Sequence, residues 1–89
     1  MHEAKLIISG KVQGVFYRTH AQETAIRLNL NGYAKNLPDG TVEALLQGSE
    51  EDINAFIEWA REGSPSAQVE NIETSWQTPD KTYDSFETY

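Results

Sequence analysis

Apolar and polar positions follow two different periods along this chain, and the shorter period marks strands. Residues 4–9, AKLIIS, alternate partly and predict one strand. Residues 41–47, TVEALLQ, place Val42, Ala44 and Leu46 on one face and predict another. Further strands are predicted at residues 32–37, 67–77 and 82–88. A shift in the apolar phase of the 67–77 segment predicts a bulge or bend within it.

Two other segments repeat at the longer, helical period. In the first, Tyr17, Ala21, Ala25 and Leu28 follow one another at steps of 4, 4 and 3, so they share one face of a helix. This helix begins at Tyr17 and ends near Asn29, where polar and glycine residues take over.

The second helix has clear signals at both of its ends. Its apolar stripe consists of Ile53, Phe56, Ile57 and Ala60. Ser49 precedes the stripe with Asp52 three residues later, a pattern close to a capping box. Gly63 ends the helix and Pro65 follows it, which is the usual order at a helix C-terminus.

The order of these elements predicts the fold. Pro38-Asp39-Gly40 is a tight turn, so the strands on either side of it form an antiparallel hairpin. The full order is β-α-β-β-α-β, the α+β arrangement called ferredoxin-like or split β-α-β. In it two helices cover one face of an antiparallel sheet, here with a short C-terminal strand in addition. We expect a single domain over residues 1–89, and this fold alone specifies no function.

The composition excludes several kinds of site and partner. The 89 residues include no cysteine, which excludes disulfides, thiolate metal ligands and a cysteine nucleophile. The longest apolar runs are three residues, too short for a membrane span or for the core of a signal peptide. We therefore expect a cytoplasmic protein without membrane association. A monomer is expected because no large apolar stripe is left over.

The charge argues against polyanionic partners but leaves room for a small anion. The net charge is −7, which disfavours nucleic acid and anionic membranes. Residues 4–38 carry five basic side chains and one acidic one, whereas residues 39–89 carry two basic and twelve acidic ones. The first third of an acidic protein is therefore basic, and a small anion could bind where those side chains converge.

The segment 10–16, GKVQGVF, has the features of an anion-binding loop. It leads directly into a helix N-terminus, where main-chain N–H groups lack partners and the helix dipole is positive. Gly10 and Gly14 allow positive φ, so successive amides can curl round one anion. Arg18 lies in the first helical turn, where the dipole opposes it unless an anion binds between them. Its planar fork of donors suits phosphate oxygens.

Simple element lengths bring Asn36 to the same end of the molecule. The first helix descends about 18 Å at ~1.5 Å per residue. The strand that ends at Asn36 climbs back roughly 17 Å at ~3.3 Å per residue. Asn36 therefore returns beside the 10–16 loop and Arg18, together with Lys11 and Lys35. Each of these residues has an ordinary structural explanation when taken alone, and it is their convergence that favours a site.

Two stretches of the chain resemble the signatures of the acylphosphatase family. Residues 10–18, GKVQGVFYR, look like the first signature, and residues 32–43, GYAKNLPDGTVE, resemble the second. The resemblance covers nearly the whole chain, including its length and the order of its elements. The sequence departs from the family pattern at Phe16, where a small residue is frequent, and at Tyr17, where Phe is common. It also lacks the basic residue that many members carry near the final Tyr89.

The resemblance implies hydrolysis of small-molecule acyl phosphates to a carboxylate and inorganic phosphate, with inorganic phosphate as a competitive inhibitor. It implies that Arg18 holds the phosphate and that Asn36 positions the attacking water. The amides that would hold the phosphate oxygens are those of Gln13, Gly14, Val15, Phe16 and Tyr17. No cofactor and no metal ion is expected, because an acyl phosphate is already activated and its leaving group is a weakly basic carboxylate.

A non-catalytic module of the same fold, binding an anion or RNA, is the alternative. RNA binding by this fold would call for aromatic residues on the third strand, but residues 41–47 contain none and include an acid. A related possibility is an acylphosphatase-like domain within a larger enzyme, as in hydrogenase maturation, against which the length of the chain argues. Release of phosphate from benzoyl phosphate would distinguish catalysis from binding.

Overall fold

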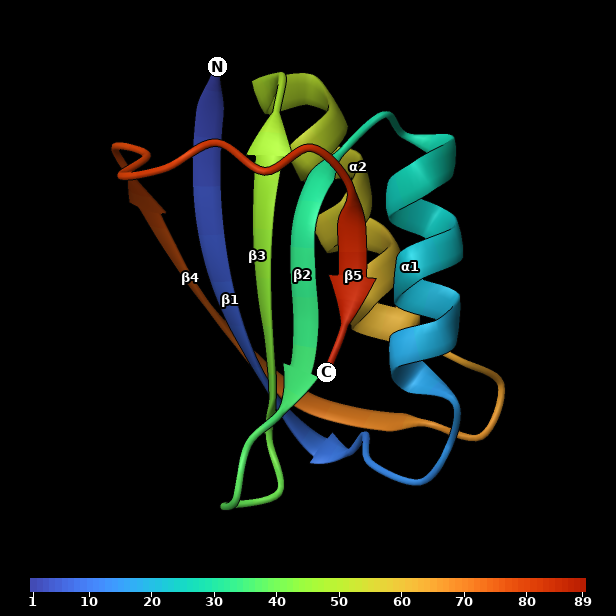
Figure 1. The fold of residues 1–89 in the computed structure, drawn as a ribbon. Coiled ribbons are helices and arrows are strands. Elements are labelled where there is room, and N and C mark those ends of the chain that lie inside the picture. The colour runs from blue at the N-terminus through green and yellow to red at the C-terminus, as the bar shows by residue number, and fades with distance from the viewer.

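The computed structural model describes all residues from Met1 to Tyr89 as one sheet with two helices on one of its faces (Figure 1). The elements in chain order are β1 (His2–Lys11), α1 (Tyr17–Arg27), β2 (Asn31–Asn36), β3 (Val42–Gly48), α2 (Glu50–Glu62), β4 (Gln68–Gln77) and β5 (Phe86–Thr88). Every predicted strand and helix is present. α1 ends at Arg27, two residues before the expected end, and β5 begins at Phe86, whereas the last strand was predicted from residue 82. The α+β, ferredoxin-like prediction is therefore confirmed.

The sheet is mixed, because the last strand joins it in parallel. Its strand order is β4-β1-β3-β2-β5. The pairs β1·β3, β1·β4 and β2·β3 are antiparallel, as predicted for the split β-α-β core. β5 instead runs parallel to β2, with Phe86 opposite Gly32 and Thr88 opposite Ala34. This pairing places the end of the chain beside β2 and α1 (Figure 1).

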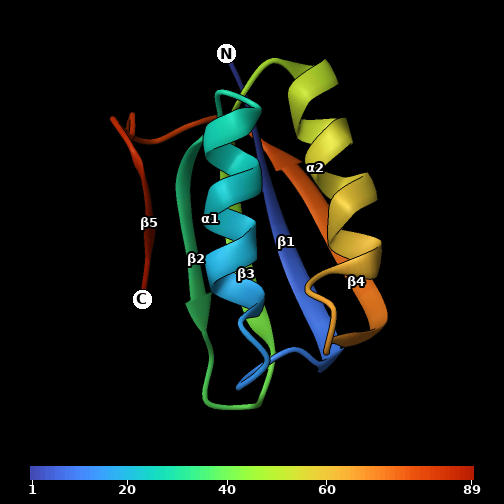
Figure 2. The ribbon, with the colours of Figure 1, turned by 90° about the vertical axis from the view of Figure 1, so that its right-hand side faces the viewer.

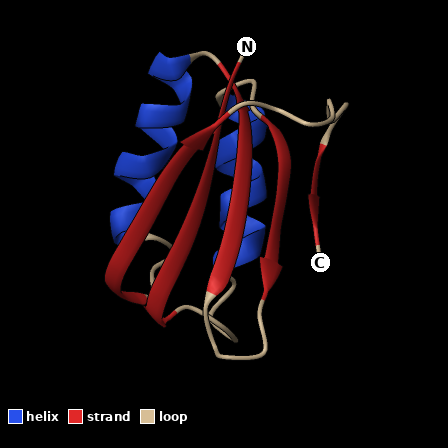
Figure 3. Cartoon of the chain, turned by 90° about the vertical axis from the view of Figure 1, so that its left-hand side faces the viewer, coloured by secondary structure: helices blue, strands red, loops and turns tan.

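The core lies between the sheet and the two helices. Ala4, Leu6 and Ile8 alternate along β1 with their side chains fully buried on the helix side. From α2, Ile53 and Phe56 of the predicted stripe meet them and are also fully buried. Burial of such a side chain stabilises the fold by about 1.5–3 kcal/mol. Both helices lie on this one face, and the opposite view shows the sheet uncovered by helices (Figures 2 and 3).

The bulge predicted in the fourth strand is present where β4 pairs with β1. Ser9 lies opposite Asn71, whereas the next residue, Gly10, lies opposite Val69, so Glu70 is the extra residue. Gly10 has φ 124°, and a Cβ at this position would lie 2.1 Å from the carbonyl oxygen of Gln68. Glycine is required here both by the backbone conformation and by the closeness of β4.

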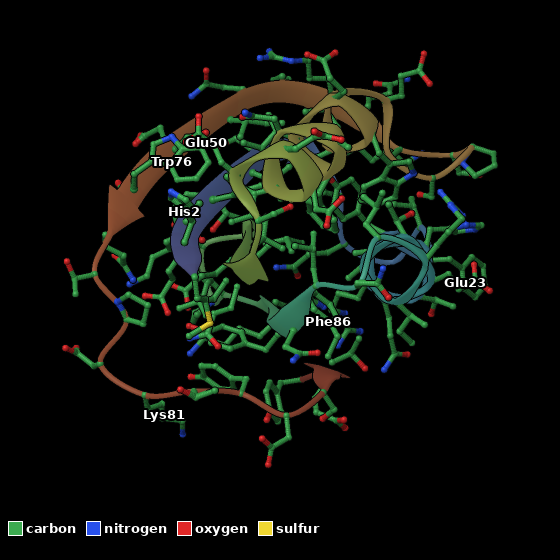
Figure 4. All side chains as sticks on the ribbon, turned by 90° about the horizontal axis from the view of Figure 1, so that it is seen from above. His2, Glu23, Glu50, Trp76, Lys81 and Phe86 are labelled. Carbon is green, nitrogen blue, oxygen red and sulfur yellow. The ribbon has the colours of Figure 1, made fainter.

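A buried polar network fastens the segment between β4 and β5 to the sheet. Glu3 is 4% exposed, and its carboxylate accepts hydrogen bonds from Gln47 Nε2 (2.7 Å) and Gln77 Nε2 (2.6 Å). Gln47 also donates to the carbonyl oxygen of Lys81 (2.6 Å) and accepts from the N–H group of Tyr83 (2.9 Å). The segment therefore crosses the face of the sheet opposite α2, where Lys81 lies in the view from above (Figure 4). This crossing carries the chain from one edge of the sheet to β5.

Candidate active site

Two buried valines anchor the loop between β1 and α1. Val12 and Val15 are buried in the core, whereas Gly14 and Phe16 between and after them are exposed. The carbonyl oxygen of Val15 also accepts a hydrogen bond from the buried hydroxyl of Ser64 (2.7 Å). The core side therefore fixes the main chain of the loop, while its outer surface is exposed to solvent.

Two residues of this loop have left-handed backbone conformations. Gly14 has φ 74° and Phe16 has φ 62°. A Cβ at Gly14 would meet no other atom within 4 Å, so it is the conformation and not crowding by protein atoms that favours glycine there. The predicted positive φ in this loop is confirmed at Gly10 and Gly14, and Phe16 adds a third position that the sequence did not indicate.

The N-terminus of α1 has no cap from the protein. Phe16, the residue before the helix, makes no side-chain hydrogen bond to it, and no acidic residue lies in the first turn. The first main-chain bond of this helix runs from the N–H group of His20 to the carbonyl oxygen of Phe16 (3.2 Å). No N–H group of residues 13–19 donates to a protein acceptor. The loop and the first turn therefore offer consecutive free donors at the positive end of a helix.

A hollow of about 270 Å³ lies over these donors. It is lined by Val12, Gly14, Phe16, Tyr17, Arg18 and Thr19 of the loop and α1, together with Thr88 of β5. Its volume is near the lower end of the roughly 300–1,000 Å³ that small-molecule sites occupy. Arg18 is the only charged residue in the lining, so the hollow is chemically suited to an anion.

Arg18 and Asn36 meet at one oxygen atom. Arg18 Nη1 donates to the main-chain oxygen of Tyr89 (2.5 Å), and the N–H group of Asn36 donates to the same oxygen (3.3 Å). The N–H group of Tyr89 in turn donates to the carbonyl oxygen of Ala34 (2.9 Å). The end of β2, the end of β5 and the first turn of α1 therefore converge, as the element lengths predicted for Arg18 and Asn36.

The side chain of Asn36 has an unused acceptor. Its Oδ1 atom is buried and is the one buried side-chain nitrogen or oxygen atom in the protein without a hydrogen-bond partner. Buried polar atoms nearly always have partners, so an unpaired one at a site requires an explanation. A donor from a water molecule or a ligand would satisfy it.

Gln13 connects the loop to the turn that follows Asn36. Its Nε2 atom donates to the carbonyl oxygens of Leu37 and Thr41, both at 2.9 Å. Within the turn, Asp39 accepts hydrogen bonds from the N–H group (3.0 Å) and the hydroxyl (2.6 Å) of Thr41, which lower the pKa of its carboxyl. The two signatures implied a role for Gln13 through its main-chain amide only. The side-chain bridge was missed because its two acceptors lie far along the chain from Gln13. Leu37 is 24 positions away and Thr41 is 28 positions away.

The basic side chains predicted to gather beside Arg18 do not all do so. Lys35 precedes Asn36 on β2 and therefore points to the other face of the sheet, where its Nζ atom lies 3.8 Å from Glu43 Oε2. Lys11 is exposed at the end of β1, and neither lysine lines the hollow. The basic character of residues 4–38 therefore reaches the hollow through Arg18 alone.

Tyr17 supports the site from beneath. Its hydroxyl donates to the carbonyl oxygen of Ala60 (2.8 Å), and its ring centroid lies 5.2 Å from that of Trp59. Burial raises the pKa of the Tyr17 hydroxyl well above its usual range, so it stays neutral. The aromatic residue at this signature position thus packs α1 against α2 and fixes the position of the first turn.

Comparison with known proteins decides the family. A sequence model of the acylphosphatase family matches residues 4–88. The protein named acylphosphatase from Syntrophus aciditrophicus is 40% identical over 86 residues, which make up 97% of this chain and 90% of that protein. The chain belongs to the acylphosphatase family.

Solved acylphosphatase structures have the same fold over the whole chain. The crystal structure of acylphosphatase from Bacillus subtilis matches with a TM-score of 0.97 and 32% identity, covering 100% of this chain and 99% of that one. The structure of T. kodakarensis HypF contains a similar region, with a TM-score of 0.88 and 34% identity. That match covers 100% of this chain but 12% of HypF, so the acylphosphatase fold also occurs as part of a much larger protein. The resemblance inferred from the two signatures is confirmed.

No group of three or more His, Cys, Asp or Glu side chains is placed to hold a metal ion. Neither helix is long and apolar enough to cross a membrane.

Proposed function

We propose that Arg18, Asn36 and the amides of the loop before α1 carry out the reaction of the acylphosphatase family in this chain. The reaction is the hydrolysis of an acyl phosphate to a carboxylate and inorganic phosphate. Full-length similarity to proteins named acylphosphatase favours this enzyme over a non-catalytic anion- or RNA-binding module. The observation that carries the assignment of residues is the row of free N–H groups beside Arg18 and the unpaired Asn36 Oδ1.

The phosphate group binds at the N-terminus of α1. Its oxygens accept hydrogen bonds from the guanidinium of Arg18 and from free main-chain N–H groups. The amides concerned are those of Gln13, Gly14, Val15, Phe16 and Tyr17. A phosphate there also meets the positive end of the helix dipole, which removes the unfavourable placement of Arg18 in the first turn. These donors are fixed before the substrate arrives, so they stabilise the negative charge as it redistributes in the transition state without reorganising.

The attacking water is positioned by Asn36. Its Oδ1 atom accepts a hydrogen bond from the water, which leaves a lone pair of the water oxygen free to face phosphorus. The new bond forms between the water oxygen and phosphorus while the bond from phosphorus to the acyl oxygen breaks. The leaving group departs as a carboxylate. An amide does not accept a proton near neutral pH, so the proton of the water passes to a phosphate oxygen of the substrate.

The proposed reaction uses no metal ion, no cofactor and no covalent intermediate on the enzyme. A carboxylate is a weakly basic leaving group, so orientation and electrostatic stabilisation can supply the rate. Inorganic phosphate, the product, occupies the same donors and inhibits competitively. We further propose that residues 1–89 act as one domain, as a monomer and in the cytoplasm.

Phosphate release from benzoyl phosphate tests the proposal. Wild-type protein should release phosphate, with competitive inhibition by inorganic phosphate, and prior dialysis against EDTA should leave the rate unchanged. A rate lost on dialysis and restored by a divalent ion would overturn the metal-free reaction. A protein that binds phosphate but never turns over benzoyl phosphate would establish the binding module instead.

A further inference from the structure

Neither burial in the core nor the local backbone conformation accounts for a phenylalanine at position 16. Its side chain is 76% exposed, the most of any large hydrophobic residue in the protein. It directly precedes α1 at φ 62° and ψ 23°, a left-handed conformation that an aromatic residue adopts only at a cost in free energy. Asn29 is the only other residue besides glycine with positive φ, and asparagine tolerates that conformation well. Glycine or asparagine would therefore suit the backbone at position 16 better than phenylalanine.

The ring of Phe16 borders the proposed phosphate site. Phe16 lines the hollow together with Arg18, and its own N–H group is among the free donors of the loop. A phosphate held by these donors must direct its acyl substituent away from them, out past the residues that form the lining. Among these, Val12 and Tyr17 are buried beneath the hollow, and Thr19 and Thr88 are small and polar. Phe16 is thus the large apolar surface that an acyl group can contact.

The charges around the hollow limit the acyl group further. Arg18 is the one basic residue in the lining, and the phosphate uses it. Lys35 is directed to the other face of the sheet and pairs with Glu43. A second anionic group on the substrate would therefore find no cation of its own, in a protein with a net charge of −7.

We propose that Phe16 is a specificity-determining residue whose ring packs against the acyl group, so that the enzyme prefers acyl phosphates with an uncharged aromatic or bulky apolar acyl group. The inference rests on the proposed function, because it takes the phosphate to lie on the loop amides. An aromatic acyl group offers the ring a stacked or edge-on contact in addition to the apolar area that it covers. A two-carbon acyl group is too short to cover the ring, and a carboxylate-bearing one gains nothing from it.

The experiment compares benzoyl phosphate with acetyl phosphate in three variants at this position. Phe16→Gly and Phe16→Asn remove the ring and suit the positive φ, whereas Phe16→Tyr keeps an aromatic ring. The quantity measured is the ratio of kcat/KM for benzoyl phosphate to kcat/KM for acetyl phosphate. Any disturbance of the loop acts on both substrates and cancels in this ratio. The inhibition constant of inorganic phosphate reports on the loop separately.

We expect the ratio to fall about tenfold in Phe16→Gly and Phe16→Asn and to stay within about twofold of wild type in Phe16→Tyr. Ile26→Ala is the matched control, because Ile26 is another exposed apolar residue (61%), within α1, but lies outside the hollow. An unchanged ratio in the two variants without the ring, or an equal fall in Ile26→Ala, would overturn the inference. Wild-type protein that hydrolyses neither substrate would instead overturn the proposed function, so the two failures are distinguishable.

Discussion

The two helices of this protein begin in opposite ways. α2 follows Ser49, which has extended backbone angles (φ −74°, ψ 152°) and whose side chain accepts a hydrogen bond from the N–H group of Asp52 (3.1 Å). Three acidic residues occupy its first turn and complement the helix dipole. α1 follows Phe16, which is left-handed and provides no cap, and its first turn contains Arg18 and no acid. The N-terminus of α2 is therefore capped by its own residues, whereas the N-terminal N–H groups of α1 have no acceptor in the protein.

The contrast has a measurable cost in stability. A side-chain cap stabilises a helix by about 1 kcal/mol, and an acid in the first turn contributes about 0.3–1 kcal/mol. α1 lacks both contributions, although it lies in the same molecule and packs on the same sheet. A cap or an acid on α1 would occupy these free N–H groups or repel the phosphate that we propose they bind. In the proposed function, the uncapped N-terminus of α1 is thus the part of the fold where phosphate binding takes precedence over stability.

The largest expected effect comes from removing the positive charge of Arg18 in the first turn of α1. Arg18→Gln should lower kcat/KM for benzoyl phosphate by at least about 10²–10³ and abolish inhibition by inorganic phosphate, because a preorganised charged donor is lost. Arg27→Gln is the matched control, since Arg27 lies in the last turn of the same helix, away from the hollow. It should keep near-normal turnover. Circular dichroism checks that both variants fold, and near-normal turnover in folded Arg18→Gln would remove the proposed site.

Variants of Asn36 should separate the binding of phosphate from the rate of hydrolysis. Asn36→Ala should lose turnover by about 10²-fold, because the water is no longer oriented, yet bind inorganic phosphate with similar affinity. Asn36→Asp should bind phosphate less well, because at ~5 Å and an effective dielectric near 20 two negative charges repel by about 3 kcal/mol. Phosphate titrations and benzoyl phosphate rates measure the two properties. If Asn36→Ala lost phosphate affinity as severely as Arg18→Gln, Asn36 would be reassigned to the phosphate contacts.

An acid added to the first turn of α1 should make the two helices more alike. Thr19 is exposed, lines the hollow and occupies the third position of α1, where helices favour glutamate. Thr19→Glu should raise the free energy of unfolding by about 0.5 kcal/mol and weaken inhibition by phosphate about tenfold. Thr19→Gln, which adds length without charge, controls for the size of the side chain. A gain in stability with unaltered phosphate inhibition would mean that the hollow does not bind the anion.

The smallest effect should follow from removing the cap of the other helix. Ser49→Ala should lower the free energy of unfolding by about 1 kcal/mol in urea denaturation, because the N–H group of Asp52 loses its acceptor. Its kcat and KM should match wild type, since Ser49 lies outside the hollow. A change in KM without a change in stability would contradict the division of roles between the two helix ends.

The sequence by itself determined the elements and the two halves of the site. Local periodicity defined which residues face the core. Gly and Pro marked where elements end because they permit or restrict particular backbone conformations, and Ser49 marked a helix start because its side chain can cap free N–H groups. Since element lengths follow from residue counts, the return of Asn36 to Arg18 was predictable as well. The bulge in β4 was also visible as a shift in the apolar phase.

Only the tertiary structure decided the contacts made between distant residues. Examples are the bridge from Gln13 to the turn at residues 37–41, the buried pairing of Glu3 with Gln47, and the parallel addition of β5. It also directed Lys35 away from the hollow and left the ring of Phe16 exposed beside it. A local pattern reports which face of an element a residue occupies. Which donor reaches which acceptor depends on the packing of whole elements against one another, which a local pattern does not contain.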